Sequence, residues 1–404
     1  MSQAHHAVEE AHSPSRFEDR IKKVGKSAKE DLKALTDTTG KLVLLDFVVG
    51  FMLIFAGITF AGLPLGTLAV LGLVLLRIQK KPQFTVPYAG LFTAVMVVAL
   101  AYVTTASILW GVSTPDQTLR RVFRICIILL LALFIAERRI DLKSILFGTS
   151  LGMLVNTVAY YAGIAPDNYH GYLTGWLGDK NVSGLYHAII PLLLFFFLKK
   201  NSHRLILLII ALPLLWLTGS RTSIAAFMIG VIWFLFAYRL NLFLKLFLGA
   251  FVAWFFNWLQ DNFADSSLFG DRTGTDWFRE QIDTASLAKL ESAPWHGLGM
   301  GQATVELDSG TFFFHNSFWT LLVEGGWPWV AAVMGLTLAA GFFWKQNRAY
   351  PTRQMGGEAA IVLLAICAWR LGEVFLTIPW ALAIGLAMSY CAAPRQNLTF
   401  YEGR

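Results

Sequence analysis

The sequence contains little charge. Asp, Glu, Lys and Arg make up 15% of its 404 residues, whereas hydrophobic residues make up 56%. Soluble globular domains carry about 25% charged residues, so this composition and the mean hydropathy of +0.56 exclude an ordinary soluble protein. The alternating pattern of an outer-membrane barrel is also missing. Lipid cannot form hydrogen bonds with the backbone N–H and C=O groups of the chain. The long apolar runs must therefore form membrane-spanning helices, in which these groups bond to each other.

The motifs of metal and nucleotide chemistry are missing too. The three cysteines, Cys126, Cys367 and Cys391, lie in apolar segments without metal-ligand spacing, so we interpret them as small packing residues. The sequence has no Asp-x-Asp pair for a divalent metal, no Walker loop and no zinc motif. We therefore expect no metal and no cofactor. Residues 1–40 are polar and lack the apolar region of a cleavable signal peptide.

Apolar segments alternate with polar turns along most of the chain. They predict an all-α polytopic membrane protein of about twelve transmembrane helices. The predicted spans are residues 42–60, 62–78, 87–110, 119–137, 142–163, 182–198, 203–218, 222–238, 241–259, 327–344, 357–375 and 377–393. These boundaries predict an N-terminal segment (1–41), a first group of spans (42–260), a long loop (261–326), a last group of spans (327–393) and a C-terminal tail (394–404).

The distribution of Lys and Arg predicts the orientation. Cytoplasmic loops are enriched in these residues, and every alternate loop here is basic if both termini are cytoplasmic. The basic loops contain Arg77, Lys80, Lys81, Arg138, Arg139, Lys143, Lys199, Lys200, Arg204, Arg239, Lys345, Arg348 and Arg353. Because the basic residues of these loops serve to fix topology, we expect no nucleic-acid partner despite the formal charge of +7. The 261–326 segment then forms a small domain outside the cytoplasm.

A second set of cations falls on the outer side in this orientation. It consists of Arg120, Arg121, Arg124, Lys180, Arg221, Arg272, Arg279 and Arg370. Cytoplasmic loops are the usual place for such residues, so charged side chains near lipid on the outer side need a functional or structural explanation. Arg120, Arg121 and Arg124 have helical spacing and are candidates for contact with acidic headgroups. Arg120 and Arg124 are also candidates for binding the substrate, whereas Arg370 and Glu373 have the spacing of a structural ion pair.

The polar turn at residues 217–223 joins two apolar segments. Arg221 falls at the start of the second segment, where exposed N–H groups and the positive end of a helix favour an anion. A guanidinium there can bind a phosphate through two parallel hydrogen bonds. An Arg that extends to lipid headgroups is the alternative, but the Ser and Thr residues around Arg221 favour phosphate. Lys180, at the outer start of another predicted span, is a candidate for the same basic cluster.

A histidine ends the long loop and opens an apolar stretch. A lone histidine beside aromatic residues is usually structural, but His315 lies at the predicted outer surface, with Asn316 next to it and Glu324 nine residues later. Histidine titrates near neutral pH, so His315 is the candidate to accept a proton from a sugar hydroxyl. Asn316 and Glu324 are candidate substrate contacts, and Glu324 comes within reach of His315 if the chain turns back.

The long loop contains the signature of a helix start. Thr273 and Asp276 have the spacing of a capping box. The predicted apolar face of this helix consists of Phe278, Ile282 and Ala285. Arg272 lies at the predicted helix N-terminus and Arg279 follows within the helix, so both are candidates for binding an anion. A solvated loop Arg is the alternative for Arg272.

Together these motifs resemble the O-antigen ligase and polymerase superfamily. The matching residues are Ser220-Arg221, Arg272 five positions before Trp277, the turn with Pro294 and Gly297-Leu298-Gly299, and His315-Asn316 leading to Glu324-Gly325. The resemblance covers nearly the whole chain and implies the C-type glycosyltransferase membrane architecture in the bacterial inner membrane. It implies transfer of a polysaccharide from undecaprenyl pyrophosphate to a sugar hydroxyl of lipid A–core, in lipopolysaccharide biosynthesis and on the periplasmic side. Arg221, Arg272 and His315 are the residues it implies to be essential.

A metal-independent, inverting mechanism follows as a hypothesis. Arg221 and Arg272 would stabilise the departing pyrophosphate in place of a metal ion, and His315 would activate the hydroxyl. Binding of phosphate by His315 is the alternative role for this residue. O-antigen polymerases and protein O-oligosaccharyltransferases share the pattern and are the alternative enzymes. A small-anion transporter is the alternative of another class, although its ionisable residues should gather near the bilayer midplane. Residues 180–182 depart from the Asn-Pro-Asn form common in the superfamily.

Overall fold

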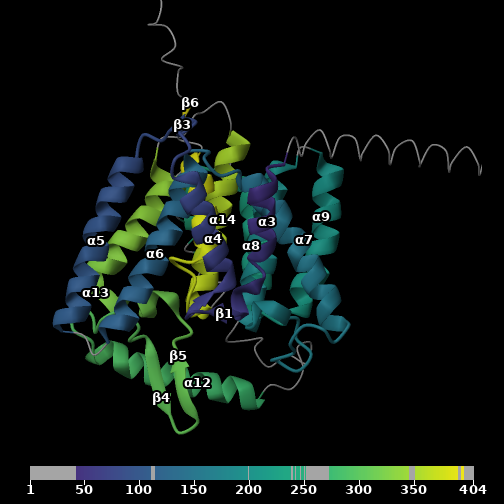
Figure 1. The fold of residues 1–404 in the computed structure, drawn as a ribbon. Helices are drawn as coiled ribbons and strands as arrows, with labels where there is room; N and C mark the ends of the chain where they lie inside the picture. The colour runs from purple at the N-terminus through teal and green to yellow at the C-terminus, as the bar shows by residue number, and fades with distance from the viewer. Residues whose placement is uncertain are drawn as a thin grey trace, which may run out of the picture.

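The computed structural model describes residues 42–110, 114–198, 200–237, 240–241, 243–245, 247–249, 251, 273–344, 351–389 and 393–394. Over these residues the fold is mostly helical: long helices stand side by side, and one helix with a hairpin covers one end of the bundle (Figure 1). We call this the α12 end, after helix α12 (Thr273–Ser292). The opposite end is the β3–β6 end, where β3 (Phe84–Thr85) pairs with β6 (Ala393–Pro394).

Judged by length and composition, four helices of the described segments could cross a membrane. They are α5 (Ala89–Leu109), α7 (Leu142–Tyr161), α8 (Lys180–Phe197) and α13 (Ser317–Leu338), which continues to Phe343. The shorter apolar helices are α4 (Leu65–Arg77), α9 (Asn201–Leu217), α10 (Arg221–Phe236) and α15 (Ile378–Ser389). Two further long helices are α6 (Pro115–Ala136) and α14 (Pro351–Arg370). These helices are compatible with a membrane protein.

The first helix is shorter than predicted. The stretch contains α3 (Leu44–Met52), a 3-10 turn (Phe55–Gly57), β1 (Thr59–Phe60) and β2 (Leu63–Pro64). The predicted span 42–60 is therefore wrong at its C-terminal end. After this helix the chain comes into close contact with the loop at Gly178. A Cβ atom added to Gly57 would lie only 2.7 Å from the Cα of Gly178, so the two backbones leave no room for a side chain. The predicted turn at Gly62 is confirmed, with φ at +78°, a conformation that favours glycine.

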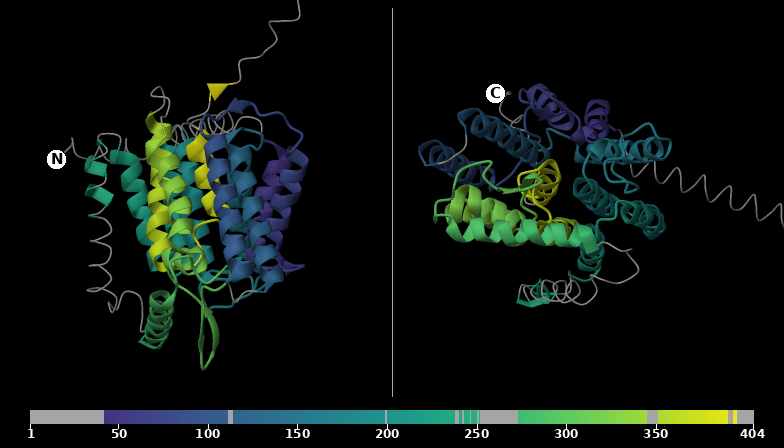
Figure 2. Two further views of the ribbon diagram at one scale, coloured as in Figure 1. Left: turned by 90° about the vertical axis from the view of Figure 1, so that its left-hand side faces the viewer. Right: turned by 90° about the horizontal axis from the view of Figure 1, so that it is seen from below.

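Helix α15 forms the centre of the bundle. Figure 2 shows it in yellow, surrounded by other helices, and its residues from Ile378 to Met388 are buried. It packs against α6, where a Cβ on Gly385 would lie 2.7 Å from the Cβ of Ile135. Small residues let helices approach closely when lipid supplies no hydrophobic driving force between them. A helix that is apolar all round belongs in such a core.

Three other predicted helices differ in extent. Helix α13 consists of two helical pieces that meet at Gly326, whose backbone is non-helical with φ at +65°. The predicted span from residue 327 matches the second piece, whereas the first piece, which begins at Ser317, was not predicted. Helix α14 covers Pro351–Arg370 where 357–375 was predicted, and α15 ends before residue 393. The predicted span 241–259 lies largely outside the described residues, and residues 1–41 lie entirely outside them.

The unit that covers the α12 end has its own small core. Figure 2 shows α12 lying across the helix ends, beside the hairpin of β4 (Thr304–Leu307) and β5 (Gly310–Phe313). The helix predicted in this stretch is confirmed, because Thr273–Ser292 forms α12. Its apolar face is confirmed as well, because Phe278, Ile282 and Ala285 belong to the cluster that also contains Val305 and Phe314. This packing fixes the position of α12 relative to the start of α13.

Candidate functional site

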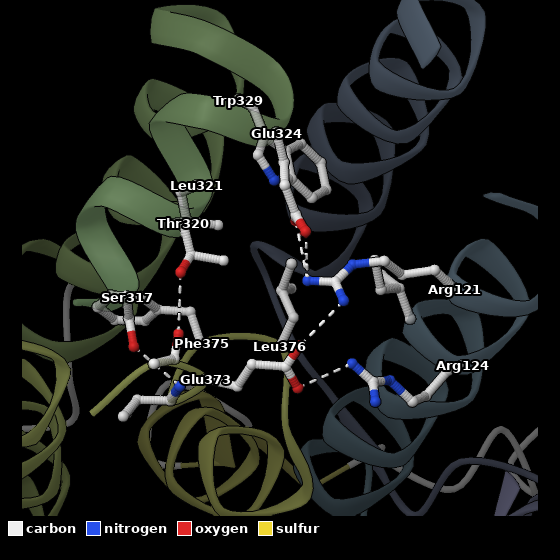
Figure 3. A pocket seen from close by; sticks show the side chains of 13 residues that line it. Arg121, Arg124, Ser317, Thr320, Leu321, Glu324, Trp329, Glu373, Phe375 and Leu376 are labelled. Atoms are coloured by element: carbon white, nitrogen blue, oxygen red, sulfur yellow. Dashed lines mark hydrogen bonds and ion pairs between the residues drawn. The ribbon is translucent and has the colours of Figure 1, made fainter. Parts of the chain in front are cut away.

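A network of charged side chains joins three elements at the α12 end (Figure 3). Arg121 on α6 lies 2.8 Å from the Glu324 carboxylate of α13 and 2.9 Å from that of Glu373, which follows α14. Arg124 lies 3.1 Å from the other oxygen of Glu373. Glu324 also accepts a hydrogen bond from the backbone N–H of Gly301, at 3.0 Å. The network therefore holds α6, α13, the 371–377 loop and the glycine-rich turn together.

Hydrogen bonds from the first turn of α13 hold the 371–377 loop in place. The Ser317 hydroxyl donates to the carbonyl of Leu371 at 2.5 Å and accepts from the N–H of Val374 at 3.0 Å. Thr320 donates to the carbonyl of Gly372 at 3.1 Å. With its backbone satisfied in this way, the loop presents Glu373 to the two arginines.

The charge of Glu373 is balanced within the network. The guanidinium of Arg124, and then that of Arg121, lowers the pKa of this carboxyl from 4.5 to about 2. A nearby positive charge favours the ionised carboxylate. Arg124 and Glu324, both predicted to contact substrate, are thus engaged with protein partners. The sequence-based pairing of Arg370 with Glu373 is wrong, because Glu373 points to α6.

The second cavity at this end contains His315. It has a volume of about 140 Å³ and is lined by Asp283, His315, Asn316, Trp319, Trp369 and Arg370. The Nδ1 atom of His315 lies 3.5 Å from one oxygen of Asp283, and Arg370 lies 3.6 Å from the other. Among the described residues this is the cavity where a titratable ring, a carboxylate, a guanidinium and indole rings meet. Convergent polar groups in a partly apolar cavity are typical of a binding site.

Asn316 and Arg279 bind backbone groups of this region. The Asn316 side chain caps α13 by accepting hydrogen bonds from the N–H groups of Phe318 and Trp319, at 2.9 and 3.2 Å. Arg279 on α12 donates to the carbonyl of Arg370 at 2.8 Å. The first contact fixes where α13 begins beside His315. The second ties α12 to the C-terminus of α14, so it brings Asp283 and Arg370 together.

Lys180 and Arg221 belong to neighbouring helix starts at the same end. Gly184, one turn after Lys180, is in close contact with Ser220, since a Cβ on Gly184 would lie 2.4 Å from the Ser220 Cβ. The Tyr172 ring lies 5.8 Å from the Lys180 ammonium and packs against Gly219, two residues before Arg221. The structure thus brings these two predicted cations into one region.

Helix α10 packs against α14 and so connects this region to the cavity side of the bundle. Ser223, in the first turn of α10, lies near the Cys367 thiol of α14. Cys367 is one turn before Arg370, which lines the His315 cavity. The start of α10 therefore lies beside the end of α14, and Arg221 and His315 belong to the same end of the bundle.

One predicted cation of the described residues turns away from the cavity. Arg120 forms an exposed ion pair with Asp116, at 3.0 Å, and turns away from the network of Arg121 and Arg124. Arg272 lies outside the described residues.

Sequence reasoning missed Asp283 and the role of Glu373. The spacing of Asp283, four residues after Arg279, puts both on one face of α12 and was the available signal.

No group of three or more His, Cys, Asp or Glu side chains that could hold a metal ion occurs in the described part of the chain. No protein-family model matches the sequence, and a search of curated proteins gives no significant match. The chemistry of the site therefore has to be argued from its own residues.

Proposed function

We propose that this protein is a glycosyltransferase of the O-antigen ligase type. It transfers a polysaccharide from undecaprenyl pyrophosphate to a sugar hydroxyl of lipid A–core at the periplasmic face of the bacterial inner membrane. The observation that carries the proposal is the gathering of His315, Arg370 and Asp283 around one cavity. Lys180 and Arg221 supply further positive charge at the same end of the bundle.

The orientation in the membrane rests on the separation of charge. Arg77, Lys80, Arg139 and Lys143 lie at or beside the β3–β6 end, where Lys80 donates to the carbonyl of Arg139 at 3.1 Å. Loops rich in such residues face the cytoplasm. In the proposed topology of about twelve spans, both chain termini are cytoplasmic and the α12 end faces the periplasm. The lipid-linked donor and acceptor then reach the site from the outer leaflet.

The cations have a chemical role in this reaction. Negative charge builds on the leaving oxygen as the bond between the anomeric carbon and the pyrophosphate breaks. Preorganised positive groups in a site partly shielded from water stabilise that charge, and the loss of one such group costs about 10²–10³ in rate in comparable enzymes. Arg221 and Lys180 are the described residues assigned to this role, together with Arg272. Catalysis then proceeds without a metal ion.

His315 acts on the acceptor in the proposed mechanism. Its ring accepts the proton of the attacking hydroxyl, a function worth about 10²–10⁴ in rate. Attack occurs from the face opposite the pyrophosphate, so the configuration at the anomeric carbon inverts. The indole rings of Trp319 and Trp369 form apolar walls on which a sugar ring can rest.

Purified variants test the two roles separately. His315→Ala should bind the undecaprenyl-pyrophosphate donor within about twofold of wild type but lose transfer by at least about 10²-fold. Arg221→Ala should lose both donor affinity and transfer. The matched controls are His170→Asn, an exposed histidine on the 162–179 loop at the α12 end, and Arg138→Ala, an arginine near the opposite end that stacks on Phe84. Full transfer by His315→Ala or Arg221→Ala would reject the assignment, and growth of the donor chain without capping of lipid A–core would assign a polymerase.

A further inference from the structure

The carboxylate of Asp283 lies between two charged partners at the wall of the His315 cavity. One oxygen is 3.5 Å from His315 Nδ1, and the other is 3.6 Å from the guanidinium of Arg370. These three residues come from α12, the start of α13 and the end of α14. We propose that Asp283 is a positioning residue that orients the His315 imidazole, so that its Nε2 atom faces the cavity as the proton acceptor. The nature of the hydroxyl that it deprotonates rests on the function proposed above.

The surroundings of His315 favour one tautomer. Nδ1 is buried and has no hydrogen bond in the structure, and Asp283 is the acceptor that faces it. A proton on Nδ1 is attracted to this carboxylate, which leaves the lone pair on Nε2. The distance of 3.5 Å is slightly longer than a hydrogen bond, and such contacts commonly shorten when substrate binds. The His315 side chain is 25% exposed, so the ring is open to a ligand in the cavity.

The position of Asp283 is fixed from two sides. Ile282, the preceding residue, is buried in the small core of the α12 unit. Arg279, one turn earlier, is bonded to the backbone of Arg370. Asp283 therefore has little freedom to move away from His315, and the Arg370 guanidinium lies beside its other oxygen. The charged groups that face the ring are Asp283 from α12 and Arg370 from α14.

The proton and the electrons can be followed through the step. The hydroxyl oxygen forms a bond to the anomeric carbon and gives its proton to Nε2. The bond between the anomeric carbon and the pyrophosphate oxygen breaks, and its electron pair leaves with the pyrophosphate. The resulting imidazolium carries a positive charge beside Asp283, which stays ionised and stabilises it, as in other His–carboxylate pairs. The imidazolium then releases its proton to water.

Asp283→Asn removes the charge but keeps the size of the side chain. In the purified protein we expect kcat for transfer to fall about 10²-fold, with KM for the donor changed by less than about twofold. Asp283→Glu should recover at least a tenth of the wild-type kcat, and Glu280→Gln, an exposed change on the same helix, should match wild type.

A second measurement does not depend on enzymatic activity. Nitrogen NMR of isotope-labelled histidine, assigned with His315→Gln, should show the Nδ1–H tautomer of His315 in wild type and a loss of that preference in Asp283→Asn. Wild-type protein that shows this tautomer but transfers no glycan would reject the proposed function and leave the pairing intact. An unchanged tautomer in Asp283→Asn, or Asp283→Asn with wild-type kcat, would overturn the pairing alone. Failure of both Asp283 variants to fold would assign the residue a structural role and overturn the proposal as well.

Discussion

Adjacent arginines of one helix turn have different partners. Arg120 pairs with the exposed Asp116, whereas Arg121 pairs with Glu324 and Glu373. The sequence predicted that these cations share a helical face, but it gave no information on which carboxylates would lie opposite. Glu324 is nine residues after His315, and the sequence allowed them to meet. The helix that begins at Ser317 instead carries Glu324 to α6. Which side chains pair across distant segments depends on how the helices pack. The spacing of residues within one helix does not determine that packing.

Glu373 should make stability depend on pH. Its pKa is about 2 in the folded protein against an ordinary value of 4.5. A carboxyl with a lowered pKa contributes stability that is fully present above about pH 5 and is lost as pH falls toward 2. Glu373→Gln should therefore lower Tm most near neutral pH, and the difference from wild type should shrink by pH 3. Thermal unfolding in detergent measures both proteins, with Glu280→Gln as the control, and a difference that stays constant from pH 7 to pH 3 would contradict the ion-pair assignment.

At the scale of the element, the kink in α13 shows what a sequence can and cannot predict. Most described helices begin close to their predicted positions, because apolar runs and turn glycines mark them locally. The Gly325-Gly326 pair was interpreted as the end of a loop, whereas in the structure it separates two helical pieces, because the backbone of Gly326 is non-helical. A Cβ on Gly326 would lie 1.9 Å from the carbonyl oxygen of Trp295, so the glycine is required by a distant segment. That contact could not be predicted from the local sequence.

Gly326→Ala should therefore destabilise the protein. The new Cβ would collide with backbone, and a φ of +65° is unfavourable for alanine, at a cost of about 1–3 kcal/mol for the backbone strain alone. Gly335→Ala, on the same helix with open space around its Cα, is the matched control and should be neutral or stabilising. Urea or thermal unfolding distinguishes the two variants. Equal stability of both would mean that the chain does not kink at Gly326.

Across the whole molecule, the charges separate into two groups. Basic residues that follow or precede helices gather near the β3–β6 end, while His315, Arg370, Lys180 and Arg221 gather at the α12 end. The alternation of basic loops in the sequence predicted this separation, since each pair of antiparallel helices returns the chain to the same side. The meeting of α12 with α13 and α14 was not predictable, because it requires the small apolar core of the covering unit.

In the proposed function, the α12 end, with its cations and His315, faces away from the cytoplasm. Single cysteines at Asp308, in the exposed β4–β5 turn, and at Gln79, exposed after α4, can be introduced into a variant that lacks the native cysteines. With the outer membrane made permeable, a maleimide that cannot cross the inner membrane should label Asp308→Cys in intact cells. Gln79→Cys should be labelled only after the inner membrane is opened. Labelling of Gln79→Cys but not of Asp308→Cys in intact cells would place the site in the cytoplasm and contradict the account.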